Sequence, residues 1–233
     1  MPKFSTTIAL LTSLFLPAFA AAQERVVLVE LFTSQGCMAC PPADEYVTEL
    51  SARDGVLPLS LHVDYWDYLG WQDQFAKAAF TQRQKDYAYA HGVRSVYTPQ
   101  IVIGGAEAAV GHDKAQIEAA IARQMRMPAD ITLTAEQTSQ GMLVIGITNP
   151  ARSLRGEVHV IVFAPERTQH IPRGENEGRT LSYTNVVLDW QMVVPWDGGA
   201  LTYEMPHNAG ENRTAVIVQE ANVGTVLAAV VVE

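Results

Sequence analysis

Residues 25–50 carry the segment RVVLVELFTSQGCMACPPADEYVTEL. The part from Val26 to Phe32 is a nearly continuous apolar run, which is the pattern of a buried strand. A polar loop then leads to Cys37-Met38-Ala39-Cys40, and the residues from Pro42 to Arg53 carry apolar side chains at helical spacing. The segment therefore predicts a strand, a loop with two cysteines and a helix in direct succession.

Cys37 and Cys40 are the only cysteines of the chain. A disulfide between them would stabilise the fold only weakly, because the chain-entropy model gives a stabilisation of about 2 kcal/mol for a four-residue loop and about 5 kcal/mol for a hundred-residue loop. A Cys-x-x-Cys pair between a strand and a helix is typical of redox chemistry. A helix N-terminus stabilises a thiolate, so we expect Cys37 to be the nucleophile and Cys40, one turn further on, the resolving cysteine. A metal-binding pair and an inert structural disulfide are the alternatives.

The first 22 residues have the pattern of a secretory signal peptide. Lys3 supplies an early positive charge, the run from Ile8 to Phe19 is apolar, and small residues follow it. The run has about a dozen residues, fewer than the roughly 20 that span a bilayer. We expect cleavage after Ala20 or Ala22 and a soluble mature protein that is periplasmic or secreted.

The composition argues against nucleic-acid binding. The formal net charge is −9 at pH 7, and loss of Lys3 with the signal peptide makes it about −10. Such a chain offers no basic patch for counterion release from a phosphate backbone. We expect no nucleic-acid partner, no membrane span and no bound cofactor.

The pattern of the chain changes near residue 128. Before it, strands and helices alternate in the order β-α-β-α-β-β-α, and after it only short strands separated by turn residues are indicated. The first set of elements covers residues 26–32, 42–53, 56–63, 72–91, 100–103 and 107–110, with a last helix capped by Asp113. The second set covers residues 131–136, 142–148, 158–164, 180–188, 201–205, 214–219 and 225–232.

These patterns predict an α+β protein with two domains. A signal peptide at residues 1–22 is followed by an α/β domain at residues 23–128. About seven short strands at residues 129–233 suggest a β-sandwich domain.

The cysteine pair, the Tyr97-Thr98-Pro99 segment before the third strand and the order of elements resemble the thioredoxin superfamily. The resemblance implies that the first domain is thioredoxin-like and that a cis-proline loop faces the dithiol. Pro99 would then be cis, and Thr98 would present its backbone to a bound substrate strand. The alternative is an ordinary trans turn proline.

More narrowly, the chain resembles an uncharacterised family of secreted thioredoxin-like proteins of Gram-negative bacteria. The segments that carry this resemblance are ELFTSQGC at 30–37, CPPAD at 40–44, HVDYWD at 62–67, YTPQ at 97–100 and RGEN at 173–176. The similarity covers essentially the whole mature chain. The resemblance implies the fold, but this family has no established reaction that could be transferred to this chain.

Three features depart from ordinary thioredoxins. Gly36 replaces the usual aromatic residue before the first cysteine, and no lysine follows Cys40. Pro41 and Pro42 follow instead, so the helix is expected to begin at Pro42, farther from Cys37. The extra residues between the dithiol and Pro99 fall in the segment from Trp66 to His91, which could form a lid or a partner surface.

Three further polar residues are candidates for the site. Glu30 lies about where thioredoxins keep a buried carboxylate that assists proton transfer, and the alternative is a surface glutamate at a strand end. His62 and Asp64 share one face of the second strand, where they either approach the active site or only make hydrogen bonds.

The charged loop from Arg173 to Arg179 lies in the second half of the chain. It is either a solvated connector or a fixed loop that docks on the first domain or on an anionic ligand.

The function expected from these features is thiol–disulfide exchange on exported proteins, with a further redox protein as partner. Cys37 attacks, Cys40 resolves, Thr98 and Pro99 position the substrate, and Glu30 assists proton transfer. The direction depends on the reduction potential.

Three other classes of function are weighed against exchange. One is a Cu(I) chaperone that uses Cys37 and Cys40, with His62 or Met38 as a further ligand. Another is a binding module of the same fold that makes no use of the thiols. A thiol peroxidase fits less well, since only Thr33 lies near the cysteine.

Overall fold

The computed structural model describes residues 25–149, 151 and 153–232. The predicted signal peptide at residues 1–22, with its cleavage positions after Ala20 or Ala22, lies outside these residues. Strand β1 (Val27–Thr33) is buried along its whole length, as its continuous apolar run predicts. It lies inside the larger sheet and ends at residues 34–40, which carry the two cysteines and are called the cysteine loop below.

The elements before residue 128 follow the predicted order. After β1 come α1 (Pro41–Ser51), β2 (Val56–His62), the short 3₁₀ helix η1 (Asp67–Leu69), α2 (Ala78–Ala90), β3 (Gln100–Ile103), β4 (Glu107–Val110) and α3 (Lys114–Met125). The Asp113 side chain caps α3 by accepting a hydrogen bond from the Gln116 amide at 3.0 Å. The predicted helix at residues 72–91 begins only at Ala78, because the residues before it form a turn around the carboxylate of Asp73.

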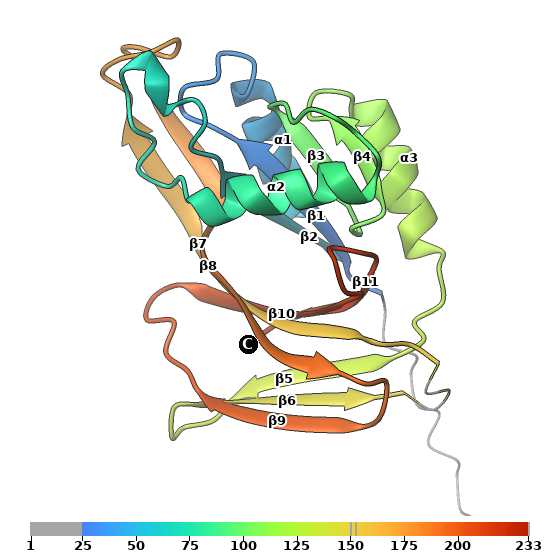
Figure 1. Ribbon diagram of the computed structural model, residues 1–233. Helices are drawn as coiled ribbons and strands as arrows, with labels where there is room; N and C mark the ends of the chain where they lie inside the picture. The colour runs from blue at the N-terminus through green and yellow to red at the C-terminus, as the bar shows by residue number, and fades with distance from the viewer. Residues whose placement is uncertain (1–24, 150, 152, 233) are drawn as a thin grey trace, which may run out of the picture.

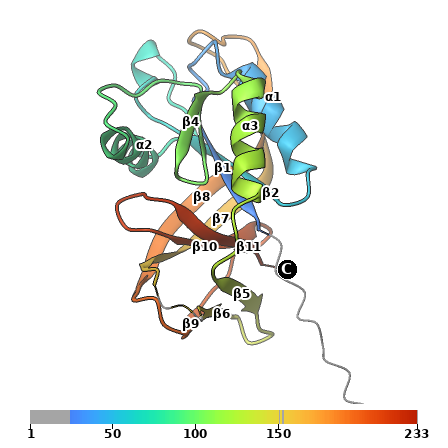
Figure 2. The same cartoon turned by 90° about the vertical axis from the view of Figure 1, so that its right-hand side faces the viewer.

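Helices cover this part of the sheet on both faces (Figures 1 and 2). Because side chains alternate along β1, Val27, Val29 and Leu31 pack with α1 and α3 on one face. Leu28 and Phe32 join the cluster on the other face, which includes residues of α2. The cysteine loop thus leaves the sheet between two packed layers.

Seven strands follow within the described residues. They are β5 (Thr132–Gln137), β6 (Met142–Thr148), β7 (Gly156–His170), β8 (Thr180–Trp196), β9 (Leu201–Pro206), β10 (Arg213–Gln219) and β11 (Val226–Val231). Their positions agree with the predicted strands, except that β7 and β8 are 15 and 17 residues long. These two strands form a long antiparallel hairpin that runs from the cysteine end of the molecule to the opposite end (Figure 1).

The long hairpin joins the strands of the two halves of the chain into one sheet. The larger sheet has eight strands in the order β11-β10-β7-β8-β2-β1-β3-β4, with β8 parallel to β2 through the pair Ser60 and Val186. The smaller sheet has three strands in the order β5-β6-β9. Register shifts after Val158 and Val162 indicate bulges, at which strands bend and twist more strongly.

The structure is therefore a mixed α+β fold with one large mixed sheet and one small antiparallel sheet. The sequence pattern predicts a separate sandwich that contains all seven later strands, whereas four of these strands, β7, β8, β10 and β11, extend the sheet that contains β1. The small sheet packs on the far part of β7 and β10 through a third apolar cluster. A domain boundary near residue 128 stays a prediction. None of the helices formed by the described residues has the length and apolar character needed to cross a bilayer.

Candidate active site

Cys37 and Cys40 form a disulfide at the point where β1 ends and α1 begins. Helix α1 starts at Pro41, one residue before the predicted start, and Cys40 is its N-cap. The Cys40 amide donates to the Cys37 carbonyl at 3.2 Å, and the amides of Ala43 and Asp44 donate to the Cys40 carbonyl. Cys40 therefore caps the N-terminus of the helix, and Cys37 lies in the turn before it.

Both cysteines are covered in this oxidised form. Cys37 is 2% exposed and Cys40 is 0% exposed, whereas Met38 between them is 65% exposed. A protein that attacks the disulfide thus needs a local rearrangement around Cys37.

Thr98 and Pro99 lie close to the cysteine loop, as the resemblance implies. The peptide bond between them is cis. Pro99 lies close to Ala43 of α1, because a Cβ atom added to Gly111 would lie 2.7 Å from Pro99 Cβ and 2.8 Å from Ala43 Cβ. The loop with Pro99 therefore packs next to the first turn of α1.

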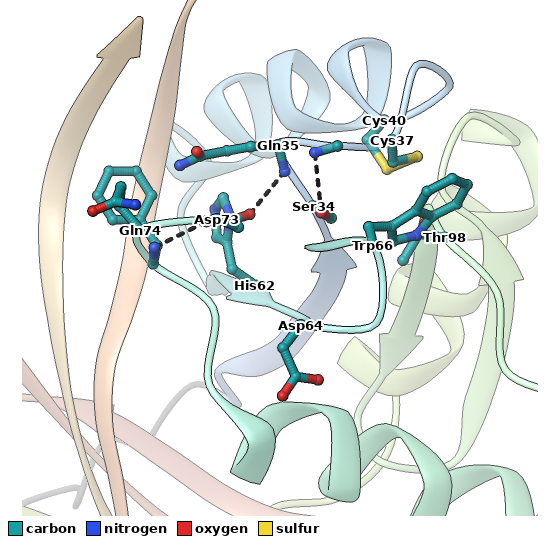
Figure 3. A network of polar contacts seen from close by, with 12 residues as sticks. Ser34, Gln35, Cys37, Cys40, His62, Asp64, Trp66, Asp73, Gln74 and Thr98 are labelled. Carbon is teal, nitrogen blue, oxygen red and sulfur yellow. Dashed lines mark hydrogen bonds and ion pairs between the residues drawn. A yellow bond between two sulfur atoms is a disulfide. The ribbon is translucent and has the colours of Figure 1, made fainter. Parts of the chain in front are cut away.

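Trp66 connects the Thr98 segment to the cysteine loop (Figure 3). Its indole Nε1 donates to Thr98 Oγ1 at 2.8 Å. A Cβ atom added to Gly36 would lie 3.1 Å from Trp66 Cβ. Gly36 is thus the residue that lets Trp66 lie against the chain just before Cys37.

A buried pair, His62 and Asp73, holds the loop before the cysteines. His62 Nδ1 lies 2.7 Å from Asp73 Oδ2, and both side chains are buried. The same Asp73 oxygen accepts the Gln35 amide at 2.8 Å, and Asp73 Oδ1 accepts the Phe75 amide. Burial alone would raise the pKa of Asp73, but His62 and these amides outweigh it and lower the pKa. Asp73 is therefore a charged anchor for the cysteine loop.

Asp44, in the first turn of α1, is a second buried carboxyl group near the cysteines. Burial raises its pKa to about 7, although His62 acts in the opposite direction. Among the described residues, Asp44 Oδ1, His62 Nε2 and Thr33 Oγ1 are buried without a hydrogen-bond partner. Buried polar atoms without partners are uncommon and suggest a site for water or proton transfer.

Glu30 lies on the face of β1 that carries Leu28 and Phe32, away from α1. Its carboxylate accepts hydrogen bonds from Arg83 at 2.6 and 3.0 Å and from the Tyr87 hydroxyl at 2.6 Å. Gln219 of β10 also bonds to both Arg83 and Tyr87. Glu30 is thus bound into a buried ion pair that ties β1 to α2 and β10.

Asp64 and His62, the remaining candidates, bind to other polar side chains. Asp64 accepts from the Thr81 hydroxyl of α2 at 2.6 Å. The His62 side chain contacts Asp73. Among residues 25–149, 151 and 153–232, no three His, Cys, Asp or Glu side chains are arranged to hold a metal ion. The alternative ligand set of Cys37, Cys40 and His62 is therefore not assembled here.

The charged loop from Arg173 to Arg179 docks on the cysteine loop, although it is far away in the sequence. Asn176, which is 1% exposed, donates through Nδ2 to the carbonyls of Gln35 and Cys37, each at 2.9 Å. The Met38 amide donates to Glu175 Oε2 at 3.1 Å. Of the two interpretations of this loop, docking on the first half of the chain is the one that agrees with the structure.

Sequence reasoning missed Asp44 and Asp73 as site residues. Asp44 has a usable signal, since a residue four positions after Cys40 shares its helical face. Asp73 has none, because it comes from a turn that folds back under the cysteine loop.

A family model described as "Protein of unknown function (DUF1223)" matches residues 28–219. This chain belongs to that family. In this DUF1223 protein, the matched range contains the cysteine pair, Asp44, the His62–Asp73 pair and the loop with Asn176.

A solved structure is also similar to this DUF1223 protein. It is the crystal structure of a protein from Agrobacterium tumefaciens, determined by a structural genomics consortium. The two chains are 33% identical, the match covers 90% of this chain and 95% of that chain, and the TM-score is 0.79. No curated protein matches this chain.

Proposed function

We propose that this DUF1223 protein is an exported thiol–disulfide oxidoreductase whose cysteine pair exchanges with disulfides of other exported proteins. In this proposal residues 25–128 form a thioredoxin-like unit and residues 1–22 direct export to the periplasm or the medium. The observation that carries the proposal is the Cys37–Cys40 disulfide at the start of α1. Its position next to the Thr98–Pro99 segment and a buried ionisable cluster adds support.

The exchange reaction balances without a further reagent. In the reduced protein, the Cys37 thiolate attacks one sulfur of a substrate disulfide, and the substrate S–S bond breaks to leave a mixed disulfide and one substrate thiolate. The Cys40 thiolate then attacks the Cys37 sulfur, which releases the second substrate thiolate. Two electrons pass to the substrate, and the reverse sequence oxidises a substrate dithiol.

Asp44 is proposed to hold and move the proton of Cys40. It follows Cys40 by one helical turn, and its amide donates to the Cys40 carbonyl at 3.1 Å. With a pKa of about 7, its carboxyl is close to half ionised at neutral pH, which suits a general base. Asp44 also borders a groove of about 440 Å³ between α1 and β8, which gives the proton a short route to solvent.

This proposal moves the proton-transfer role from Glu30 to Asp44. Both oxygens of Glu30 are already bound to Arg83, and one also accepts from Tyr87. These contacts occupy both carboxylate oxygens, and Glu30 lies on the face of β1 that is away from α1 and Cys40. The Thr98–Pro99 segment keeps its proposed role as the surface on which a substrate strand lies beside the cysteines.

Trapping of mixed disulfides tests the proposal. Cys40→Ala should leave Cys37 joined to substrate proteins, because the resolving thiol is missing, and Cys37→Ala should leave no such adducts. The measurement is non-reducing gel analysis of the periplasmic fraction for both variants and the unaltered protein, with partners identified by mass. Absence of adducts in all three, with a reduced Cys37 that resists alkylation at neutral pH, would favour the binding module instead.

A further inference from the structure

The loop between β7 and β8 makes contacts that the exchange reaction itself does not require. It is anchored at both ends, because the Ile171 amide donates to the Arg179 carbonyl and the Gly178 amide to the Ile171 carbonyl. Within it, the Arg179 guanidinium donates to Asn176 Oδ1 at 2.8 Å, which orients the Asn176 amide group. The loop is therefore a fixed structure rather than a solvated connector.

Asn176 bonds to the backbone on both sides of Gly36. Its single Nδ2 donates to the carbonyls of Gln35 and Cys37, and its side chain is buried. The Gln35 amide is bound from the other side by Asp73. Two side chains from separate parts of the chain thus fix the peptide units that lead into Cys37.

Glu175, next to Asn176, places a negative charge beside the cysteine pair. Its Oε2 accepts the amide of Met38, the residue that follows Cys37. Four covalent bonds separate that nitrogen from the Cys37 sulfur, so the carboxylate oxygen lies at most about 8 Å from the sulfur. The Met38 amide is also occupied, and cannot turn its hydrogen toward a thiolate.

We propose that Glu175 and Asn176 are positioning residues for the cysteine pair, and that Glu175 restrains the formation of the Cys37 thiolate. This inference rests on the proposed function for its biological meaning, but it concerns the chemistry of Cys37 alone. Asn176 holds the loop in place, and Glu175 acts through its charge. The reduced form is then less favoured relative to the disulfide, because reduction creates a negative charge at Cys37.

Other charged groups lie near the cysteines, but their contacts differ from those of Glu175. Asp44 lies behind Cys40 on α1, the His62–Asp73 pair lies under Gln35, and Arg179 bonds to Asn176. Within the part of the chain that the structure describes, Glu175 is the charged side chain bonded to the backbone between the two cysteines. Its removal therefore isolates one charge without disturbing the buried groups.

The test uses the reduced full-length mature protein and a small alkylating reagent. Glu175→Gln should increase the rate of Cys37 alkylation near neutral pH by about twofold to threefold, because the Coulomb effect of one charge raises the thiolate fraction and the weaker nucleophilicity of a more stable thiolate offsets about half of that gain. Glu177→Gln is the matched control, because it removes the same charge from an exposed position on the same loop. It should leave the rate unchanged.

Two further measurements separate charge from general structure. The difference between the unaltered protein and Glu175→Gln should shrink in high salt, since an exposed charge is screened. In glutathione buffers at alkaline pH, where the thiols are ionised, two glutathione thiolates reduce the disulfide and become oxidised glutathione, and Glu175→Gln should shift this equilibrium toward the dithiol by about threefold. Equal alkylation rates and equal glutathione equilibria for both proteins would overturn the inference.

A double variant tests whether Glu175 acts through the docked loop. Asn176→Ala should release the loop and raise Cys37 reactivity, and adding Glu175→Gln to it should then change little. Additive effects of the two substitutions would show that the effect of Glu175 on Cys37 reactivity does not require the loop contacts of Asn176. All of these readouts use small thiols and reagents, so they are independent of whether mixed disulfides with proteins form in the trapping experiment.

Discussion

Replacing Asp44 with asparagine should stabilise the protein at alkaline pH and have little effect near pH 4. The pKa of Asp44 is raised by burial from 3.8 to about 7 in the folded protein. Between these values the folded protein keeps a proton that the unfolded chain has lost, so the free energy of unfolding falls as the pH rises. Above pH 7 the cost of ionising Asp44 reaches about 4 kcal/mol, since each pKa unit corresponds to about 1.4 kcal/mol. Asparagine carries no charge at any pH and removes this cost.

The measurement is urea denaturation of the oxidised protein and of Asp44→Asn over this pH range. The difference in unfolding free energy should be near zero at about pH 4 and should grow to as much as about 4 kcal/mol at about pH 9. Glu45→Gln is the matched control, because it removes a charge from the exposed face of the same helix. A difference that is the same at both ends of the range would refute the buried, shifted carboxyl.

The Asp44→Asn substitution should also slow the release of mixed disulfides. Without a carboxylate to accept the Cys40 proton, attack of Cys40 on Cys37 should slow by on the order of a hundredfold near neutral pH. The defect should decrease at high pH, where hydroxide removes the proton. Rapid mixing of the reduced variant with a model disulfide, followed by acid quenching and mass analysis, measures this step directly. Unchanged release at neutral pH would assign Asp44 to folding alone.

Two other substitutions test the buried contacts around the site. Asn176→Ala should lower the free energy of unfolding by about 1–3 kcal/mol, because two buried carbonyl oxygens of the cysteine loop lose their donor; urea denaturation at neutral pH measures the loss, and a value near zero would mean that water replaces the amide. Glu30→Gln should cost about 3–5 kcal/mol, because it leaves the buried Arg83 without its counter-charge. Thermal unfolding would show this loss, and a stable variant with slowed exchange would return the proton-transfer role to Glu30.

The local elements of the fold could be predicted from the sequence because each one carries its own signal. The strand predicted at residues 26–32 is observed at Val27–Thr33, and the Asp113 cap of α3 is confirmed. The length of the β7–β8 hairpin could not be predicted. The last six residues of β7 and residues 189–195 of β8 are exposed or half-buried, a pattern that also suits a connector.

The candidate site was less accessible to prediction than the fold. The cysteine pair and the Thr98–Pro99 segment are visible as motifs, but the partners that fix them come from distant turns. Asp73 is 38 residues from Gln35, and Asn176 is 139 residues from Cys37. Such contacts depend on which strands pair, and pairing between β8 and β2 has no local sequence signal.

The β7–β8 hairpin also limits how this chain could be shortened or recombined. A fragment that ends at residue 128 would keep the cysteine motif but would lose β8, and the backbone of β2 would become an open sheet edge. The Asn185 side chain, which donates to the Pro58 carbonyl, would be lost as well. Exchange of the first half between related genes would therefore have to carry the hairpin with it. An engineered fusion that uses this cysteine motif should therefore retain a segment more than a hundred residues away.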